Sequence, residues 1–437
     1  MKGELIRPAG FDNIGDKNVM PIMGGFSSFP RDTRVEEGIA PDFISDEHFK
    51  QLAECGLNVV GGYTNFEWEP ELVLKSLDLA HKCGLQYRVW DSWFMESYLS
   101  GQTLTKEAVE KRIEAYCHHP AYCGIQILDE PTSEIYMNNP KKNISNFGDL
   151  IHVLRELDVF NVQCILPLYD YHIDGMKDVY RAYVREYCET FKPEMLRYDH
   201  YPFNDKGPQL ERFFWNMSVI REFAKEYDIP FSVAIQAGGQ WNDHQAHFDS
   251  IPYYPNEGQF YWNVNVCLAM GTKCIGYFPV VQPFHFSWAK SKKYDFERNG
   301  FFGHDGRKNP WYYYAQNINK QIAAIDEVLM NSVNEGMIVN GEQAEKDVQT
   351  TNCVIQEKAY RELIGVEGHT LIGCYDFEGK TALYVVNYEM ETSQKISLRF
   401  KEPCNVYIIQ NAESHFDIAE NLELDMTPGD GILIVVE

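Results

Sequence analysis

Apolar and polar positions follow one repeating order along most of the chain. Between residue 18 and about residue 335, a short apolar stretch is followed by a polar loop, an amphipathic helical pattern and the next apolar stretch. The helical patterns repeat every three or four residues, and Gly56, Gly84 and Gly271 follow three of them, where a left-handed cap needs no Cβ. The stretches that we interpret as strands are 19–26, 57–65, 85–93, 122–131, 161–170, 194–203, 230–239 and 272–281.

These strands are apolar almost without interruption, which is typical of parallel strands buried on both faces. Eight strand–helix units in succession predict a (β/α)8 TIM barrel. A doubly wound open sheet is the alternative, but the chain has no G-x-G-x-x-G phosphate loop. We therefore predict an α/β protein with a catalytic barrel domain over residues 1–335.

After about residue 340 the pattern changes to an alternation with period two. Stretches such as 371–389 and 431–437 alternate in this way, are separated by Gly, Pro, Asn and Asp turns, and are not interrupted by a helix-length pattern. This predicts a small C-terminal all-β sandwich domain over residues 336–437.

Composition restricts the partners and the location. The 437-residue chain is 44% hydrophobic, and its net charge of -25 would repel nucleic acid and anionic membranes. The eleven cysteines are scattered and form no C-x-x-C pair, which indicates reduced thiols in a cytoplasmic protein. No apolar leader or membrane-spanning run is present, although a leader already removed would leave no trace. We predict no cofactor and no metal, and a homo-oligomer stays open.

The predicted strand ends carry the chemistry, because parallel barrels place their active sites there. Those ends hold carboxylates, amides and aromatic rings but almost no Lys or Arg, whereas phosphorylated substrates would need cations. A small neutral carbohydrate is therefore the favoured partner. The candidate substrate-binding residues are Tyr63, Asn65, Asp91, Trp93, Asp129, His200, Tyr201, Gln236, Trp241 and Trp288.

Each of these candidates also has a structural interpretation. The tryptophans and the 14% aromatic content serve core packing as well as sugar stacking, and His200 could satisfy a loop carbonyl. His244 and His247 do not predict a metal site, because they lie in a probable loop with too few ligands.

The sequence "LDEP" at residues 128–131 offers the best candidate for acid catalysis. Glycoside hydrolysis needs two carboxyl groups, one of them protonated at working pH. At the mouth of an aromatic-lined barrel, desolvation would raise the pKa of Glu130 and make it a general acid, with Asp129 accepting a sugar hydroxyl. The structural alternative is that both acids cap the following segment.

A family resemblance rests on the same residues. "ILDEP" resembles the Asn-Glu-Pro signature that ends strand four in the clan of (β/α)8 retaining glycosidases, which includes β-galactosidases and cellulases. With "LRYDHYPF" at residues 196–203, the chain resembles more closely a group of glycoside hydrolases from gut bacteria, over most of the barrel. The resemblance implies that Glu130 is the acid/base.

One position departs from that clan. Its nucleophile is a Glu that ends strand seven, whereas "VAIQAGGQW" places Gln236 there, and an amide cannot attack an anomeric carbon. Asp199 in "YDHYP" is the first choice for the second catalytic carboxylate, followed by Asp91, Asp243 and Glu67. Retention or inversion stays open, because it depends on the separation of the two groups.

The leading interpretation is a glycosidase that cleaves a small neutral oligosaccharide or glycoside. A metal-dependent sugar isomerase or epimerase using Glu130, Asp199 and His200 is one alternative. A non-catalytic carbohydrate-binding barrel is the other, because of Gln236.

Overall fold

The computed structural model describes residues 18–30, 41–157, 164–165, 176–239, 253–281 and 299–437. Eight strands in this part form one sheet, in the order β4-β3-β2-β1-β10-β9-β6-β5, and each neighbouring pair is parallel. Their bounds are β1 (Ile22–Gly24), β2 (Val59–Asn65), β3 (Gln86–Trp90), β4 (Tyr122–Gln126), β5 (Cys164–Ile165), β6 (Leu196–Asp199), β9 (Phe231–Gln236) and β10 (Cys274–Phe278).

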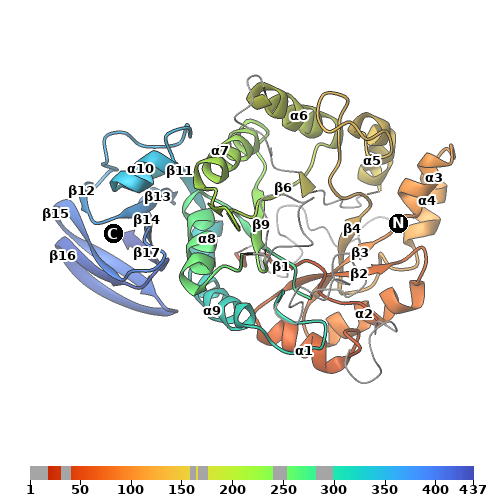
Figure 1. Cartoon of the computed structure of the whole chain (residues 1–437), viewed down its shortest axis with the longest axis horizontal. Coiled ribbons are helices and arrows are strands. Elements are labelled where there is room, and N and C mark those ends of the chain that lie inside the picture. Colours follow the sequence, from red (N-terminus) through yellow and green to blue (C-terminus); the bar gives the residue numbers. More distant parts are fainter. Residues whose placement is uncertain (1–17, 31–40, 158–163, 166–175, 240–252, 282–298) are drawn as a thin grey trace.

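This order is the one expected of the predicted barrel. The first strand lies between the second and the last, and β4 and β5 stand at the two ends of the sheet. A pairing of β4 with β5 would close the ring, and it is not among the pairings of the described residues. The parallel α/β class is confirmed, and helices surround the strands (Figure 1). They are α1 (Asp46–Glu54), α2 (Pro70–Lys82), α3 (Trp93–Leu99), α4 (Lys106–Ile113), α5 (Gly148–Glu156), α6 (Met176–Phe191), α7 (Leu210–Glu226), α8 (Glu257–Ala269) and α9 (Pro310–Met330), with the 3-10 turn η2 (Ile144–Phe147).

Local sequence signals set the helix ends. The side chains of Ser45 and Thr105 cap α1 and α4, and Asn256 forms a reciprocal capping box with Gln259 at the start of α8. Gly56 and Gly271 follow α1 and α8 with φ angles of 82° and 97°, as the pattern predicted. These residues mark where the helices begin and end.

Residues 332–437 form an antiparallel sheet, which confirms the predicted all-β character of this region. Its order is β11-β13-β14-β17-β15-β12, with β16 paired to β15. The strands are β11 (Ser332–Asn340), β12 (Leu363–Glu367), β13 (Thr370–Phe377), β14 (Lys380–Asn387), β15 (Gln394–Gln410), β16 (Glu413–Met426) and β17 (Gly431–Val436). The pattern missed the short helix α10 (Glu342–Asp347), and the predicted boundary at residues 335/336 falls inside β11. The division into two domains and the two-layer sandwich remain predictions.

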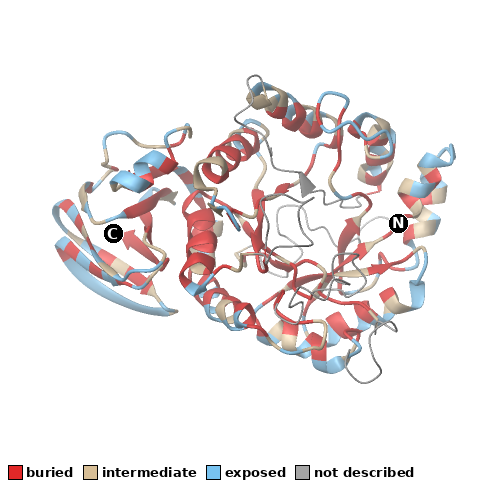
Figure 2. Ribbon diagram, viewed as in Figure 1, coloured by how far each residue is buried: buried red, intermediate tan, exposed pale blue. Residues whose placement is uncertain are grey.

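Successive side chains of β13, β14 and β17 point to opposite faces of the sheet. Cys374, Leu383 and Ile434 point into a core of the β region, whereas Tyr375 and Tyr384 belong to the core shared with the barrel. Tyr375 donates a hydrogen bond to the carbonyl of Leu268 on α8, and the backbone of Ala269 comes so close to Gly373 that a Cβ there would clash. Helix α8 is consequently buried nearly all round, between the parallel strands and the β region (Figures 1 and 2).

Two arginines fill part of the interior of the parallel sheet. Arg88 on β3 and Arg197 on β6 are buried. A Cβ at Gly61 would lie 3.3 Å from the Arg88 guanidinium, and one at Gly276 would lie 3.2 Å from that of Arg197. The glycines of β2 and β10 thus leave the space that the two guanidinium groups occupy. In the described part of the chain, no helix is long and apolar enough to cross a bilayer.

Candidate active site

Four strands of the sheet end in a partly exposed residue. Along β3, β4, β6 and β10 the residues before the last are mostly buried, and the last residue is partly exposed. These last residues are Trp90, Gln126, Asp199 and Phe278. The carboxyl ends of parallel strands are the ends at which barrels hold their active sites.

Glu130 lies in the segment that follows β4 and is partly buried. Its backbone is in the left-handed region, with a φ of 51°. For a residue other than glycine this conformation costs on the order of 1–3 kcal/mol and persists only where the surroundings impose it. Burial raises the pKa of the Glu130 carboxyl, the neighbouring Asp129 raises it further, and Lys142 lowers it.

Asp199 ends β6, and one of its carboxylate oxygens, Oδ1, is buried without a hydrogen-bond partner among the described residues. Burial raises the pKa of Asp199 to about 8, and the charges of Glu130 and Asp129 add to this. A hydrogen bond with the Tyr201 side chain partly opposes the shift. Asp199 therefore retains its proton near neutral pH.

These couplings indicate that the carboxyl groups after β4 and at the end of β6 lie near one another. Glu130 and Asp129 both act on Asp199, although they lie about 70 residues away in the sequence. Two interacting carboxyls titrate as a pair and share a proton over part of the pH range. A carboxyl that keeps its proton near neutral pH, with a second carboxyl near it, can take part in acid–base bond cleavage.

Five partly exposed aromatic rings extend from Asp199 around the other side of the opening; we call them the aromatic arc. Tyr201 stacks on Phe278 at 5.9 Å, and Phe278 contacts Phe26 at 5.0 Å. Phe26 contacts Tyr63 at 4.7 Å, and Tyr63 contacts Trp90 at 5.2 Å. The arc follows the ends of β6, β10, β1, β2 and β3. It brings the predicted Tyr63 and Tyr201 together and adds Phe26, Phe278 and Trp90, which were not among the predicted binding residues.

Asp91 is fully buried and its carboxylate is already engaged. Arg112 forms a two-point ion pair with it, at 2.8 Å from Nε and 2.7 Å from Nη2. The Tyr116 hydroxyl and the backbone N–H of Trp93 also donate to it, both at 3.1 Å. The same Arg112 pairs with Glu67 at 2.6 Å, and its guanidinium lies 5.5 Å from the Trp93 ring. Arg112 on α4 therefore links Asp91, Glu67 and the Trp93 ring of α3.

Asn65 and His200 are also held by the protein. The Asn65 carbonyl oxygen accepts hydrogen bonds from the backbone of Glu67 at 3.0 Å and of Ser92 at 3.1 Å. His200 is buried, its Nδ1 lies 3.3 Å from the Asn216 amide, and burial keeps its pKa well below the usual value. A neutral, anchored imidazole suits the orientation of the segment after Asp199.

Gln236 ends β9 with its side-chain amide fully used. Its Nε2 donates to the carbonyls of Phe203 at 2.7 Å and Gly238 at 3.0 Å, and its Oε1 accepts from the Phe203 N–H at 3.0 Å. Both amide hydrogens are thus committed to the backbone, which favours a structural role. The predicted binding residues Trp241 and Trp288, and also Asp243, lie outside the described residues.

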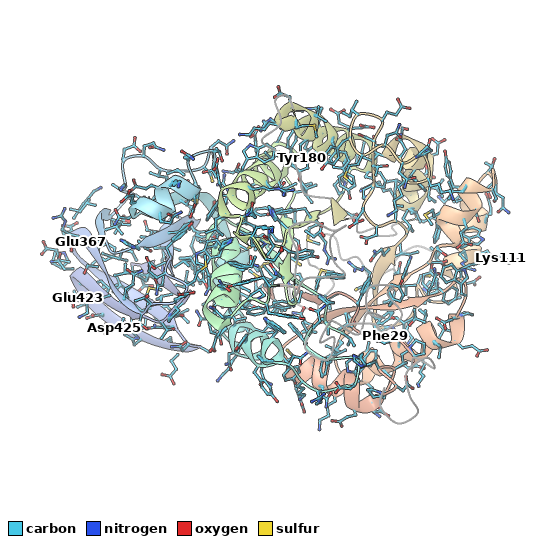
Figure 3. The ribbon with its side chains drawn as sticks, in the orientation of Figure 1. Phe29, Lys111, Tyr180, Glu367, Glu423 and Asp425 are labelled. Atoms are coloured by element: carbon cyan, nitrogen blue, oxygen red, sulfur yellow. The ribbon has the colours of Figure 1, made fainter. Side chains whose placement is uncertain are left out.

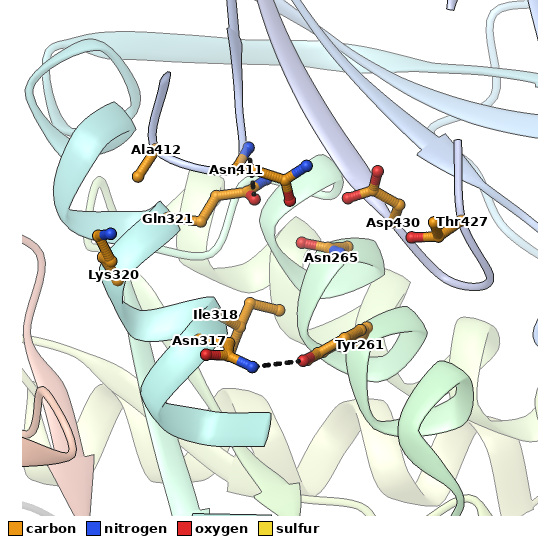
Figure 4. A pocket seen from close by; sticks show the side chains of 10 residues that line it. All are labelled: Tyr261, Asn265, Asn317, Ile318, Lys320, Gln321, Asn411, Ala412, Thr427 and Asp430. Atoms are coloured by element: carbon orange, nitrogen blue, oxygen red, sulfur yellow. Dashed lines mark hydrogen bonds between the residues drawn. The ribbon is translucent and has the colours of Figure 1, made fainter. Parts of the chain in front are cut away.

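Two further observations concern the described residues as a whole. No group of three or more His, Cys, Asp or Glu side chains there could hold a metal ion. A cavity of about 240 Å³ lies between α8, α9 and the β region (Figure 4). Its amides mostly join the two regions: Asn265 bonds Tyr384 and the Gly429 carbonyl, and Gln321 bonds Gly431 and Asn411.

Comparison with known proteins gives structural matches only. No protein-family model and no curated protein matches the sequence. A catalytic mutant of Gan42B, a GH42 β-galactosidase from G. stearothermophilus, is 10% identical, with a TM-score of 0.57 over 95% of this chain and 98% of its own. A β-galactosidase from Marinomonas ef1 is 12% identical, with a TM-score of 0.48 over 73% of this chain and 63% of its own. The similar solved structures include further glycoside hydrolases, and at this identity the match to Gan42B shows only that the chain shares the fold of this enzyme.

Proposed function

We propose that the protein is a glycoside hydrolase that cleaves a bond in a small neutral oligosaccharide or glycoside. The observation that carries this proposal is the position of two partly buried carboxyls, Asp199 at the end of β6 and Glu130 in the segment after β4, with the pKa of both raised by burial. The shared fold supports the reaction class only as analogy.

The raised pKa of Asp199 bears on which carboxyl is the general acid and which is the base or nucleophile. Because the pKa of Asp199 is about 8, this group enters the reaction protonated near neutral pH and can serve as the general acid. Glu130 is then the base or nucleophile, and its raised pKa makes it a stronger base than an exposed carboxylate. The reverse assignment, with Glu130 as the acid, is the one that the sequence predicts, and both assignments use the same pair.

The surroundings favour an uncharged sugar. Rings of the aromatic arc offer flat apolar faces, while Asp129, Glu130 and Asp199 offer hydrogen-bond acceptors for hydroxyl groups. The acidic side chains of Asp129 and Glu130 disfavour an anionic substrate. Trp93, Trp241 and Trp288 remain proposed contacts with more distant parts of the substrate.

Four coarser expectations accompany this proposal. We propose that the parallel sheet closes into a (β/α)8 barrel, that residues 1–335 and 336–437 form two domains joined through α8, and that the protein works in the cytoplasm. A homo-oligomer is compatible with the proposal. Because the Gln236 amide is committed to backbone groups, we propose that no strand-seven nucleophile takes part.

The test is a panel of aryl glycosides of both anomers, with product stereochemistry followed by NMR. We expect turnover of at least one glycoside, and a loss of at least about 100-fold for both Glu130→Gln and Asp199→Asn. Activity retained by both variants would remove the pair from the mechanism. Sugar binding without turnover would leave a carbohydrate-binding barrel, and interconversion of a free sugar that is lost with a chelator and restored by metal would favour the isomerase class.

A further inference from the structure

The backbone of Glu130 needs a restraint, and the structure shows where one acts. Glu130 has a φ of 51° and is followed by Pro131, whose ring already limits the preceding residue. A glutamate released from its surroundings would leave this left-handed conformation. Its carboxyl would then move relative to Asp199.

The segment after Glu130 is fixed at two points. Thr132 bonds through its backbone to Lys142 at 2.9 Å and to Ile144 at 2.8 Å, which holds the loop to the start of η2. Nearer to Glu130, the carbonyl of Pro131 accepts a 2.6 Å hydrogen bond from the Tyr183 hydroxyl. This bond comes from α6, a distant element, and it acts one residue from the strained position.

Tyr183 is itself rigid. It is fully buried on the inner face of α6, and its ring lies 4.9 Å from that of Tyr136 and 6.2 Å from that of Tyr180, which is labelled in Figure 3. Burial and nearby negative groups, Glu130 and Asp199 among them, raise its pKa well above the usual value. The hydroxyl therefore remains a donor throughout the pH range in which the two carboxyls titrate.

We propose that Tyr183 is a positioning residue, which holds Glu130 in its left-handed conformation, and so beside Asp199, through the hydrogen bond to the Pro131 carbonyl. This inference rests on the proposed function for its effect on turnover. It assigns Tyr183 no contact with substrate. The sequence gives no sign of it, because the bond joins residues 52 positions apart.

The test is Tyr183→Phe, which removes the donor and keeps the buried ring. We expect kcat to fall by up to about 100-fold, as small misplacements of catalytic groups do, with KM within about twofold. The pH–rate limb that belongs to the carboxyl pair should also move. A crystal structure of the variant should show Glu130 out of the left-handed region or its carboxyl displaced.

Tyr180→Phe is the matched control. Tyr180 is equally buried on the same helix, and its hydroxyl has no hydrogen-bond partner among the described residues. We expect this variant to keep the wild-type kcat, KM and Glu130 conformation. If Tyr183→Phe keeps the Glu130 backbone and carboxyl in place, the inference is overturned, whatever the activity. A wild-type protein inactive on every glycoside would instead overturn the proposed function, and the variant's structure alone would then decide this inference.

Discussion

At the scale of single residues, Glu130 adopts a backbone conformation that a glutamate does not favour. A left-handed backbone favours glycine, yet the chain places a glutamate there, ahead of a proline. Residues in such conformations concentrate at functional sites, where strain is tolerated for the sake of the side chain. Lys192 provides a comparison, because it is left-handed at 44° and also precedes a proline, but it is exposed at the end of α6.

Replacing Glu130 by glycine should separate stability from activity. We expect Glu130→Gly to raise the free energy of unfolding by up to about 1 kcal/mol, because it removes backbone strain, while turnover is lost. Lys192→Gly should give a similar gain with unchanged turnover. Urea unfolding and kcat measurements check both, and a clearly destabilised Glu130→Gly protein would show that the side chain is there for packing.

The raised pKa of Asp199 makes stability depend on pH with a definite sign. Its folded pKa of about 8 exceeds the unfolded value near 4, so between these values the folded state holds a proton that the unfolded state has released. Stability therefore falls as pH rises through this window, by at most about 1.4 kcal/mol per pH unit for one group.

Asp199→Asn should remove this contribution. We expect the variant's stability relative to wild type to increase between about pH 4 and pH 8 and to level off above, as measured by urea unfolding at several pH values. Asp425→Asn, at an exposed position on β16 (Figure 3), should show no such trend. A difference that is flat over the window would mean that Asp199 is ionised in the folded protein.

At the scale of elements, the sequence pattern predicted the parallel strands, because alternation and apolar runs are local signals. Asp199 ends β6 as predicted, whereas β4 already ends at Gln126, so that Glu130 lies in the segment after this strand and not within the predicted strand 122–131. The engagement of Asp91 by Arg112, and of Gln236 by the Phe203 backbone, depends on partners brought close only by folding. Ring-to-ring contacts such as Phe26 with Tyr63 are equally invisible to pattern.

Position 236 tests whether the strand-seven end can accept a carboxylate. In Gln236→Glu two carbonyl oxygens, of Phe203 and Gly238, would face the new side chain without a donor. We expect a loss of at least about 1–3 kcal/mol in the free energy of unfolding and no gain in turnover. Gln349→Glu adds the same charge at an exposed position and should be nearly neutral. A more active Gln236→Glu protein would restore the strand-seven nucleophile to consideration.

At the scale of the whole molecule, the β region is joined to the barrel strands through α8 rather than attached at the surface. Tyr388 and Phe214 both contact Trp262, and Tyr388 also donates to Asp347 of α10 at 2.8 Å. Phe213 contacts the same tryptophan and also His200, next to Asp199. A continuous set of packed rings thus links the β region to the segment that carries a candidate catalytic carboxyl, and unfolding of one part should disturb the other.

Asn265 on α8 tests this cooperation, because its amide is shared between the two regions. It accepts a 2.7 Å hydrogen bond from Tyr384 on β14 and donates at 2.8 Å to the Gly429 carbonyl, all in buried surroundings. Asn265→Ala leaves two buried groups unpaired, at a cost of about 1–3 kcal/mol each. We expect one unfolding transition, shifted as a whole, by both tryptophan fluorescence and far-ultraviolet circular dichroism. Asn317→Ala, at an exposed amide on α9 that reaches Tyr261 only at 3.4 Å, should change stability by less than about 0.5 kcal/mol. Two separated transitions in Asn265→Ala would show that the β region unfolds independently, because a cooperative interface cannot lose one side and leave α8 folded.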